Sequence, residues 1–425
     1  MPDNAPSATT RSAVQALALH PGPQFGLDAA AAALSVPVEE AARLLDALVT
    51  QGLLVEVSPL RYQLADRQHS RTRPLPGNDP HRRDTVRRII DWYQVTATAA
   101  EQAVTAYRIR PHAVPAHLSA GVGRLATWSQ AVDWLEAERV NLVAAVHAAA
   151  GDMPDVAFSL ADTMWPLFRL GGHYPDRLEV DRVALDCARR LDSPDLHLAA
   201  SQRAAEGLCD AGRFGQATRL LQACLHAGER GGDTHRIAPA LGGLTAVALA
   251  RGDLDVAERH ARRAVNVSKA SGSTRHRVLA LLVLGQVYRA SGRPALALAH
   301  VRDAQRLLQT LTRVDPRTRR RVLPDPYTTV RLEVEHGLAL SGDGKHQQAA
   351  GLLAKALTAM TALHARRGQA IAQHALGQVT AASGNHTAAR RHLLDALEVS
   401  TALGDHEAAA ARQLLRQLPP GKDTL

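Results

Sequence analysis

Small residues recur at a fixed interval through the apolar pattern of residues 153–418, and a glycine marks each interval. The glycines are 40 residues apart except for one step of 52, and they stand at Gly172, Gly212, Gly252, Gly292, Gly344 and Gly384. Two further sets of small residues follow the last five glycines at constant offsets: Ala217, Ala257, Ala297, Ala349 and Ala389, then Cys224, Ala264, Ala304, Ala356 and Ala396. Small residues at fixed offsets allow paired helices to approach closely. The pattern therefore predicts a series of stacked helical hairpins.

A second series of residues keeps the same rhythm and marks the helix starts. Its members are Ser193, Asp233, Ser273, Asp325, Ala365 and Asp405. Ser and Asp side chains accept hydrogen bonds from the free amides at a helix N-terminus. Each repeat is therefore read as a cap, helix A, a tight turn with the glycine, and helix B. This frame is tetratricopeptide-like, lengthened from the usual 34 residues. We predict an all-α fold: a right-handed α-solenoid of about six 40-residue repeats over residues 151–418, with a small N-terminal winged-helix domain.

The N-terminal region has a different pattern, with shorter elements. Residues 1–8 are polar and are expected to be disordered. Residues 9–72 predict a winged helix, because three short helices precede a two-stranded hairpin. The helices are expected at Thr10–Leu19, Leu27–Leu34 and Val38–Gln51, and the strands at Leu53–Val57 and Arg61–Leu64.

The remaining segments complete the predicted domain organisation. Residues 73–81 contain a Pro- and Gly-rich stretch and are predicted to be a linker. Residues 82–150 are predicted to form a helical adaptor, and Asp405–Leu418 a terminal capping helix before a tail at 419–425. The long step is 12 residues longer than the others, and the extra length is assigned to a basic loop, Arg313–Asp325, which contains Arg317, Arg319, Arg320 and Arg321.

Composition supports a helical solenoid. Of the 425 residues, 46% are apolar but only 3% are aromatic, so the core must consist mainly of Ala and Leu at short helix–helix distances. The net charge of +9 could attract acidic partners or nucleic acid, although a solvated basic surface explains it equally simply. The absence of a signal peptide and of an apolar run of 18 residues leads us to expect a cytoplasmic protein without membrane contact.

Two sequence stretches resemble one group of bacterial regulators. IDWYQVTATAAEQ (90–102) and WLEAERVNLVAAV (134–146), together with the repeats, are similar to the Streptomyces-antibiotic-regulatory-protein type of signal transduction ATPases with numerous domains (STAND). In that family a DNA-binding and P-loop ATPase half precedes a winged helix, a helical adaptor and a tetratricopeptide sensor. The resemblance covers residues 9–418 and corresponds to the second half alone.

The chain departs from this family at two nucleotide-binding features. No GxxxxGK[ST] motif occurs in the sequence. The family's winged helix carries a Met-His-Asp motif whose His senses the nucleotide, and the matching positions here are Leu64, Ala65 and Asp66. The resemblance therefore implies no ATP binding by the family's route, unless a partner chain supplies the ATPase half. We expect no cofactor.

The sequence also lacks the usual signatures of catalysis. It contains no HExxH motif, no Cys/His cluster with zinc-ligand spacing and no CxxC pair among its three cysteines. No nucleophile–base pair has a supporting context. We therefore predict a protein that is not an enzyme and that has no metal site.

The functional hypothesis is a regulatory or sensor protein, linked to the control of bacterial secondary metabolism. Its ligand would be a peptide, a protein or a small-molecule effector in the concave groove of the solenoid. One alternative is a DNA-binding transcriptional regulator, but the third helix carries Glu39, Glu40 and Asp46 against Arg43, which disfavours phosphate contact. The other alternative is a scaffold for biosynthetic enzymes. The oligomeric state is not predicted.

Groove residues follow from counting along helix A. With the turn glycine at position 15, positions 2, 5, 9, 12 and 13 of a tetratricopeptide repeat usually face the groove. In the Gly212, Gly252, Gly292 and Gly384 repeats, the polar residues at these positions are Gln202, Glu206, Asp210, Gln286, Arg289, His374 and Gln378. They are the predicted partner-binding residues, with the basic loop as the second choice. Two readings stay open beside binding: these side chains face water, or the solenoid's own termini fill the channel.

Overall fold

The structure is a computed structural model that describes residues 8–65, 80–106, 108, 125, 127–311, 313–314, 321–322 and 325–419. The described residues form two compact units. Unit 1 extends to Val104 and includes the residues from 125 to Trp165, and unit 2 contains Pro166 onward with the short stretch after Val104. Within the described ranges, no helix combines the length and the apolar character needed to cross a membrane.

Unit 1 begins with the elements that the hydrophobic pattern predicted. Its elements are α1 (Ala8–Leu17), β1 (Phe25–Gly26), α2 (Leu27–Leu34), α3 (Val38–Thr50), β2 (Leu54–Ser58), β3 (Arg61–Leu64), α5 (Pro80–Thr105), α6 (Trp128–Ala137), α7 (Arg139–Ala150) and α8 (Pro154–Thr163). The three strands form an antiparallel sheet in the order β1-β3-β2, with Tyr62 opposite both Phe25 and Glu56. The predicted helices and hairpin are present with ends shifted by at most two residues. β1 is an addition, and the assignment as a winged helix stays a prediction.

A buried carboxylate links the hairpin of unit 1 to its later helices. Glu138 lies between α6 and α7 and forms an ion pair with Arg61 of β3. Its Oε2 accepts hydrogen bonds from the hydroxyl of Tyr93 on α5 at 3.0 Å and from Nδ2 of Asn141 at 2.6 Å. Burial, followed by the charge of Glu138, raises the pKa of Tyr93 well above its ordinary value. Glu138 and Asn141 belong to the WLEAERVN stretch, so this stretch serves here to hold unit 1 together.

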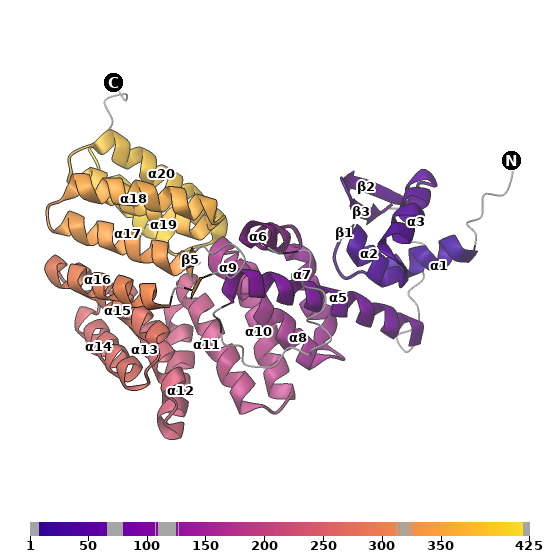
Figure 1. Ribbon diagram of the computed structural model, residues 1–425, viewed down its shortest axis with the longest axis horizontal. Coiled ribbons are helices and arrows are strands. Elements are labelled where there is room, and N and C mark those ends of the chain that lie inside the picture. The colour runs from indigo at the N-terminus through magenta and orange to yellow at the C-terminus, as the bar shows by residue number, and fades with distance from the viewer. Residues whose placement is uncertain are drawn as a thin grey trace. The chain divides into compact units, whose positions relative to one another are not determined.

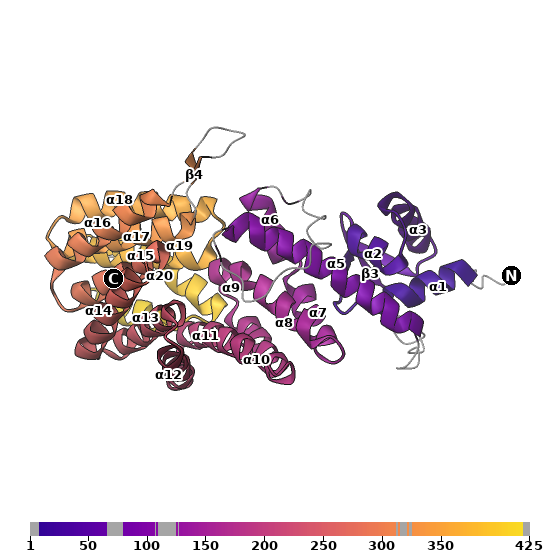
Figure 2. The same cartoon turned by 60° about the horizontal axis from the view of Figure 1, so that its bottom comes forward.

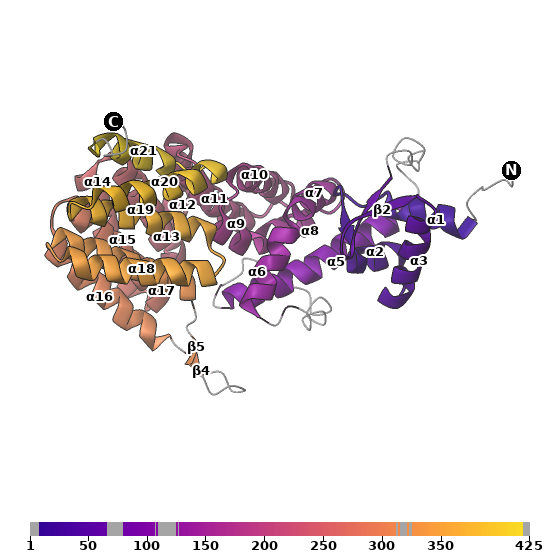
Figure 3. The same ribbon diagram turned by 90° about the horizontal axis from the view of Figure 1, so that it is seen from above.

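Unit 2 is a tetratricopeptide-like α-solenoid, in which the helices form successive antiparallel pairs (Figures 1 and 2). The helices are α9 (Trp165–Gly171), α10 (Tyr174–Arg190), α11 (Pro194–Asp210), α12 (Phe214–Gly231), α13 (Thr234–Arg251), α14 (Leu254–Ala270), α15 (Thr274–Ala290), α16 (Pro294–Thr310), α17 (Pro326–Gly342), α18 (His346–Ala362), α19 (Arg366–Ala382), α20 (His386–Leu403) and α21 (Glu407–Gln417). The predicted solenoid fold is confirmed. Helix α21, the predicted capping helix, packs beside α20 (Figure 3).

The predicted caps and turns occupy their expected places. The side chains of Ser193, Asp233, Ser273 and Asp325 each accept a hydrogen bond from a backbone amide in the first turn of the following helix. Ala365 forms no capping hydrogen bond, because its methyl side chain has no acceptor atom. The marker glycines all have positive φ, between 68° at Gly292 and 88° at Gly172, which explains why glycine recurs at this turn.

The small residues of the repeat lie at the contacts between helices. Ala257 and Ala297 are fully buried, and so are the equivalent alanines of the other repeats. Gly377 shows how close these contacts are, because a Cβ atom there would stand 2.6 Å from Cγ of Leu393. Substitution at these positions would therefore force the helix pair apart.

The long step in the repeat differs from the plain loop that was predicted. It contains two short antiparallel strands, β4 (Arg313–Val314) and β5 (Arg321–Val322), which pair Arg313 with Val322. This hairpin stands out from the helical pairs of the solenoid (Figure 2). The predicted basic residues Arg317, Arg319 and Arg320 lie outside the described residues, as does the side chain of Arg321.

Candidate functional site

The helix A series of unit 2 encloses a channel of about 620 Å³. Its walls come from the C-terminal turns of α11, α13 and α15, from the middle of α17, from most of the length of α19 and from α21, with Phe214 of α12 and Ser400 of α20. Its apolar lining consists of Cys209, Phe214, Ala246, Leu249, Ala250, Ala290, Val334, Leu338, Ala370, Ile371, Ala375, Ala410 and Leu414. A volume of this size is within the range of about 300–1,000 Å³ found for ligand pockets.

Five of the seven predicted groove residues line this channel: Asp210, Gln286, Arg289, His374 and Gln378. Nε2 of His374 and Nε2 of Gln378 lie 3.2 Å apart, within hydrogen-bonding distance. Gln286 has no hydrogen-bond partner among the described residues, so its amide is open to the channel. Counting from the turn glycine thus brought together residues from three different repeats. Their role in binding stays a prediction.

The other two predicted residues, Gln202 and Glu206, are not part of the channel lining. Both are on α11, one to two turns before the channel begins at Cys209. Glu206 is 3.6 Å from the guanidinium of Arg177, and Nε2 of Gln202 is buried without a partner in the described part of the chain. At this end of the solenoid α10 contributes Arg177, which pairs with Glu206 at a position that counting assigned to the groove.

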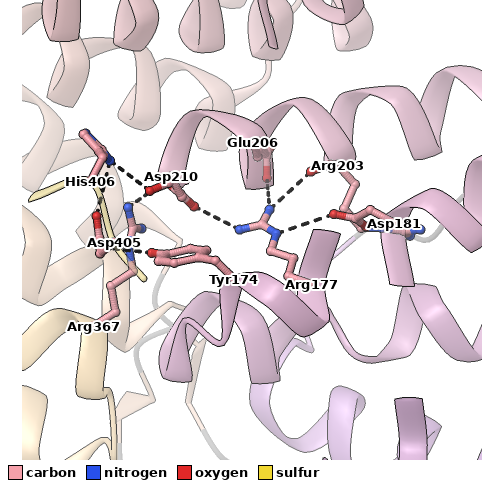
Figure 4. A network of polar contacts seen from close by, with 9 residues as sticks. All are labelled: Tyr174, Arg177, Asp181, Arg203, Glu206, Asp210, Arg367, Asp405 and His406. Carbon is pink, nitrogen blue, oxygen red and sulfur yellow. Dashed lines mark hydrogen bonds and ion pairs between the residues drawn. The ribbon is translucent and has the colours of Figure 1, made fainter. Parts of the chain in front are cut away.

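The first and last repeats contact each other at the wall of the channel (Figure 4). Asp210 on α11 forms ion pairs with Arg177 at 2.9 Å and with Arg367 on α19 at 2.6 Å. Its backbone carbonyl accepts a hydrogen bond from the amide of His406, at 3.3 Å. Asp405, which precedes α21, accepts a hydrogen bond from the hydroxyl of Tyr174 at 3.0 Å. We call these five residues with Tyr174 the closure network.

Charge in the closure network is balanced within the protein. Burial would raise the pKa of the Asp405 carboxyl, but the hydrogen bond from His406 and the charge of Arg367 lower it to about 2. Burial would likewise lower the pKa of His406, but Asp405 and the carbonyl of Asp210 raise it to about 9. At neutral pH Asp405 is therefore ionised and His406 protonated, so each stabilises the other.

The closure network continues into a buried cluster between α10 and α11. Asp181 accepts a hydrogen bond from Nε of Arg203 at 2.8 Å and lies 3.6 Å from Nε of Arg177. All three side chains are at least 94% buried. Buried charges are best tolerated when they are paired and hydrogen-bonded. Each charge here faces a countercharge, but Oδ2 of Asp181 has no hydrogen-bond partner among the described residues.

A second buried carboxylate, that of Asp325, connects separate repeats. Besides capping α17, Asp325 contacts Arg275 at 2.8 Å and Arg169 at 3.4 Å. Although burial opposes ionisation, these two guanidinium groups hold the pKa of Asp325 well below its usual range. The cap residue that the sequence identified is therefore also an electrostatic bridge.

Arg289 lines the channel, but its charge is already paired. Its Nε lies 2.6 Å from Oε1 of Glu335, a carboxylate with only 3% of its side chain exposed. Burial raises the pKa of Glu335 despite the pairing with Arg289. Removing Arg289 would leave this carboxylate without its nearest countercharge, so Arg289 has a structural role that counting alone did not reveal.

Sequence reasoning missed Arg331, a further cation of the channel. Applied to the Gly344 repeat, the same count places Arg331, Val334 and Leu338 at positions 2, 5 and 9, and all three line the channel. The sequence therefore indicates that Arg331 faces the groove, but the Gly344 repeat follows the irregular 52-residue step and was left out of the count.

The described residues show few features of metal binding or of nucleophilic cysteine chemistry. They contain no group of three or more His, Cys, Asp or Glu side chains arranged to hold a metal ion. The three cysteines are buried and unpaired. Burial raises the pKa of Cys209 to about 12 and that of Cys224 to about 11, so neither is poised as a nucleophile.

Comparisons with known proteins agree with this fold. Residues 240–310 match the family model described as tetratricopeptide repeat. Regulatory protein AfsR of Streptomyces griseus is 27% identical over 430 residues, which cover 95% of this chain and 44% of that protein. This chain thus spans less than half the length of the curated relative that it matches.

Solved structures show a more distant likeness. A Rap protein complexed with Competence and Sporulation Factor has a TM-score of 0.48 and 12% identity, over 68% of this chain and 83% of the other. A STAND protein with a tetratricopeptide repeat sensor from Pyrococcus horikoshii has a TM-score of 0.40 and 12% identity, over 97% of this chain and 60% of the other.

Proposed function

We propose that this chain is a regulatory protein that binds a peptide or protein segment in the channel of unit 2. The observation that carries the proposal is the channel itself, where an apolar lining from α13, α15, α17 and α19 is interrupted by a few polar groups. Extended peptides and amphipathic helices bind through this combination, in which apolar contacts contribute most of the affinity and polar groups set the register.

The name of the matched relative supports a regulatory role for this chain. The similarity to a regulatory protein from Streptomyces griseus extends over 95% of the chain. We extend the proposal to the control of bacterial secondary metabolism, on the resemblance to the Streptomyces-antibiotic-regulatory-protein type. Because the P-loop motif is absent and Ala65 replaces the nucleotide-sensing His, ligand capture by this chain would not require its own ATP hydrolysis.

Site-specific photo-crosslinking tests the location of binding. A benzophenone amino acid at Ala290, which lines the channel, is compared with the same group at Ala354, an exposed residue on α18. We expect peptide or protein segments from a bacterial lysate to cross-link at position 290 and not at 354, and we expect Ala250→Trp, which fills the channel, to abolish the product. Equal products at both positions, or an unchanged product with Ala250→Trp, would remove the channel as the binding site.

The scaffold and DNA-binding alternatives predict other results. A scaffold would cross-link to the same enzymes from the outer helices, at position 354. DNA binding through α3 is disfavoured because Glu39, Glu40 and Asp46 are all exposed there. We expect no retardation of random duplex DNA at about 50 mM salt, and retention that falls steeply with added salt would favour the DNA-binding alternative.

A further inference from the structure

The second turn of α17 places a guanidinium without an ion pair in the channel. Arg289 and Arg367, the other two arginines of the lining, both contact carboxylates at 2.6 Å. Arg331 differs from them, because no described residue forms an ion pair or a hydrogen bond with its guanidinium. Its side chain is only partly exposed, and it lines the channel.

Burial and two neighbouring positive charges make it unfavourable for the guanidinium of Arg331 to have no ion-pair partner. Burial lowers the pKa of Arg331, and the positive charges of Arg169 and Arg367 lower it further, against opposing effects of Tyr327 and Asp325. Asp325 is already held by Arg169 and Arg275. Glu335, one turn further along α17, interacts electrostatically with Arg331, but its direct ion pair is with Arg289 at 2.6 Å. A partly buried charge that makes no direct ion pair costs stability.

A neighbouring hydroxyl lacks a partner as well. The side chain of Tyr327, one turn before Arg331, is 1% exposed, and its OH group has no hydrogen-bond partner among the described residues. The guanidinium of Arg169 lies 4.9 Å from the centroid of the Tyr327 ring. The start of α17 therefore gathers hydrogen-bond donors and positive charge with too few acceptors.

The remaining lining decides what kind of acceptor would fit. Val334 and Leu338 continue the face of α17 beyond Arg331, and Ile371 of α19 lines the same channel, so the body of a ligand here is apolar. The exposed carboxylate of the lining is Glu407 on α21, which lies 3.9 Å from both His374 and His406. Glu407 would repel a ligand carboxylate, whereas Arg331 would attract one.

We propose that the channel recognises a short peptide segment with apolar side chains and a carboxylate, and that this carboxylate pairs with the guanidinium of Arg331. The planar guanidinium can donate two parallel hydrogen bonds to a carboxylate, which makes the pairing specific in geometry as well as in charge. This inference rests on the proposed function, since it names the ligand chemistry of the same channel.

Affinity selection from a defined library tests the inference. The probe is a synthetic library of eight-residue apolar peptides in matched pairs, with Asp or Glu against Asn or Gln and with a free carboxyl terminus against an amide. The full-length chain is immobilised as wild type, Arg331→Gln, Arg331→Lys and Arg219→Gln. Arg219→Gln is the matched control, because it removes the same charge from an exposed position on α12 outside the channel.

We expect the wild type and Arg219→Gln to retain the carboxylate member of each pair at least tenfold better than its neutral match. Arg331→Gln should lose this preference, and Arg331→Lys should keep part of it. Arg331→Gln should also melt at the wild-type temperature or above, because it removes an unpaired charge. A lower melting temperature would assign Arg331 a structural role and overturn the inference.

Failure of the role assigned to Arg331 and failure of the proposed function give different results. Retention of peptides without a carboxylate preference, or with one that survives in Arg331→Gln, would overturn the role of Arg331 and leave the proposed function in place. Retention of no peptide by the wild type would overturn both.

Discussion

The two helices of a repeat in unit 2 meet through small apolar residues, whereas the first and last repeats meet through charged groups. Ala257 and Ala297 are buried at contacts within their own repeats. His406 and Asp210, by contrast, come from segments 196 residues apart and meet in the closure network. A solenoid is built from nearest-neighbour contacts, and these specify each repeat separately. The closure network depends on all the repeats between its ends, so it reflects the curvature of unit 2, and four of its residues form part of the channel wall.

The largest expected effect is on the closure network itself. Asp405→Ala removes a carboxylate with 2% of its side chain exposed, and it leaves Arg367, His406 and the hydroxyl of Tyr174 with a missing partner. We expect the free energy of unfolding of unit 2 to fall by about 3–5 kcal/mol. Urea denaturation followed by circular dichroism measures this change. Asp395→Ala, at an exposed position on α20, is the control and should cost little. Similar losses for the two variants would show that the closure network contributes nothing.

The apolar contacts are tested by a matched pair of substitutions on α16. Ala297 is fully buried, while Ala299 on the same helix is exposed. Ala297→Leu should cost about 1–3 kcal/mol by overpacking, and Ala299→Leu should leave the denaturation midpoint nearly unchanged. Ala257→Leu on α14 should behave like Ala297→Leu. An unchanged midpoint for both buried variants would contradict the assignment of these alanines to helix contacts.

The closure network should also make stability depend on pH, whereas the apolar contacts should not. The pKa of His406 is raised from 6.5 to about 9, so its contribution is fully present below pH 6.5 and is lost as the pH rises through 9. Allowing for partial exposure, we expect a loss of about 1–2 kcal/mol over this interval. His406→Gln should be less stable than the wild type at pH 6 and should approach it at pH 9. A constant difference between the two at all pH values would exclude titration of His406 as the cause.

The smallest expected effect on stability concerns the open part of the channel. Gln286 has no partner among the described residues, so Gln286→Ala should change the free energy of unfolding by less than about 0.5 kcal/mol. Arg289→Ala should destabilise the protein more, because Glu335 would lose its countercharge. Partner binding, measured by the photo-crosslinking yield from position 290, should fall with Gln286→Ala. An unchanged yield would place partner contacts elsewhere in the channel.

The local order of the chain could be predicted well from the sequence. The glycine spacing located the turns, and the Ser and Asp series located four helix caps. The pattern of apolar and polar residues located the three helices and the hairpin of unit 1. Counting within one repeat also placed Asp210, Gln286, Arg289, His374 and Gln378 on a common surface, because each repeat presents helix A in the same way.

Which of these residues remain open to a ligand was decided only by the tertiary structure. Asp210 and Arg289 have the polar character of binding residues, yet both are committed to ion pairs within the protein. Helix α21 and the residues before it form part of the channel wall. Arg331 has no such partner within the described residues.

The physical reason is the range of the interactions. Turns, caps and helix pairing depend on residues within about 40 positions of one another, and a repeated pattern displays them directly. Ion pairs such as Arg367–Asp210 join residues 157 positions apart, and their formation depends on the small rotation accumulated from each repeat to the next. The sequence by itself therefore determined the repeats and the face that lines the channel. The tertiary structure alone decided where the first and last repeats meet and which charges of the channel have no partner among the described residues.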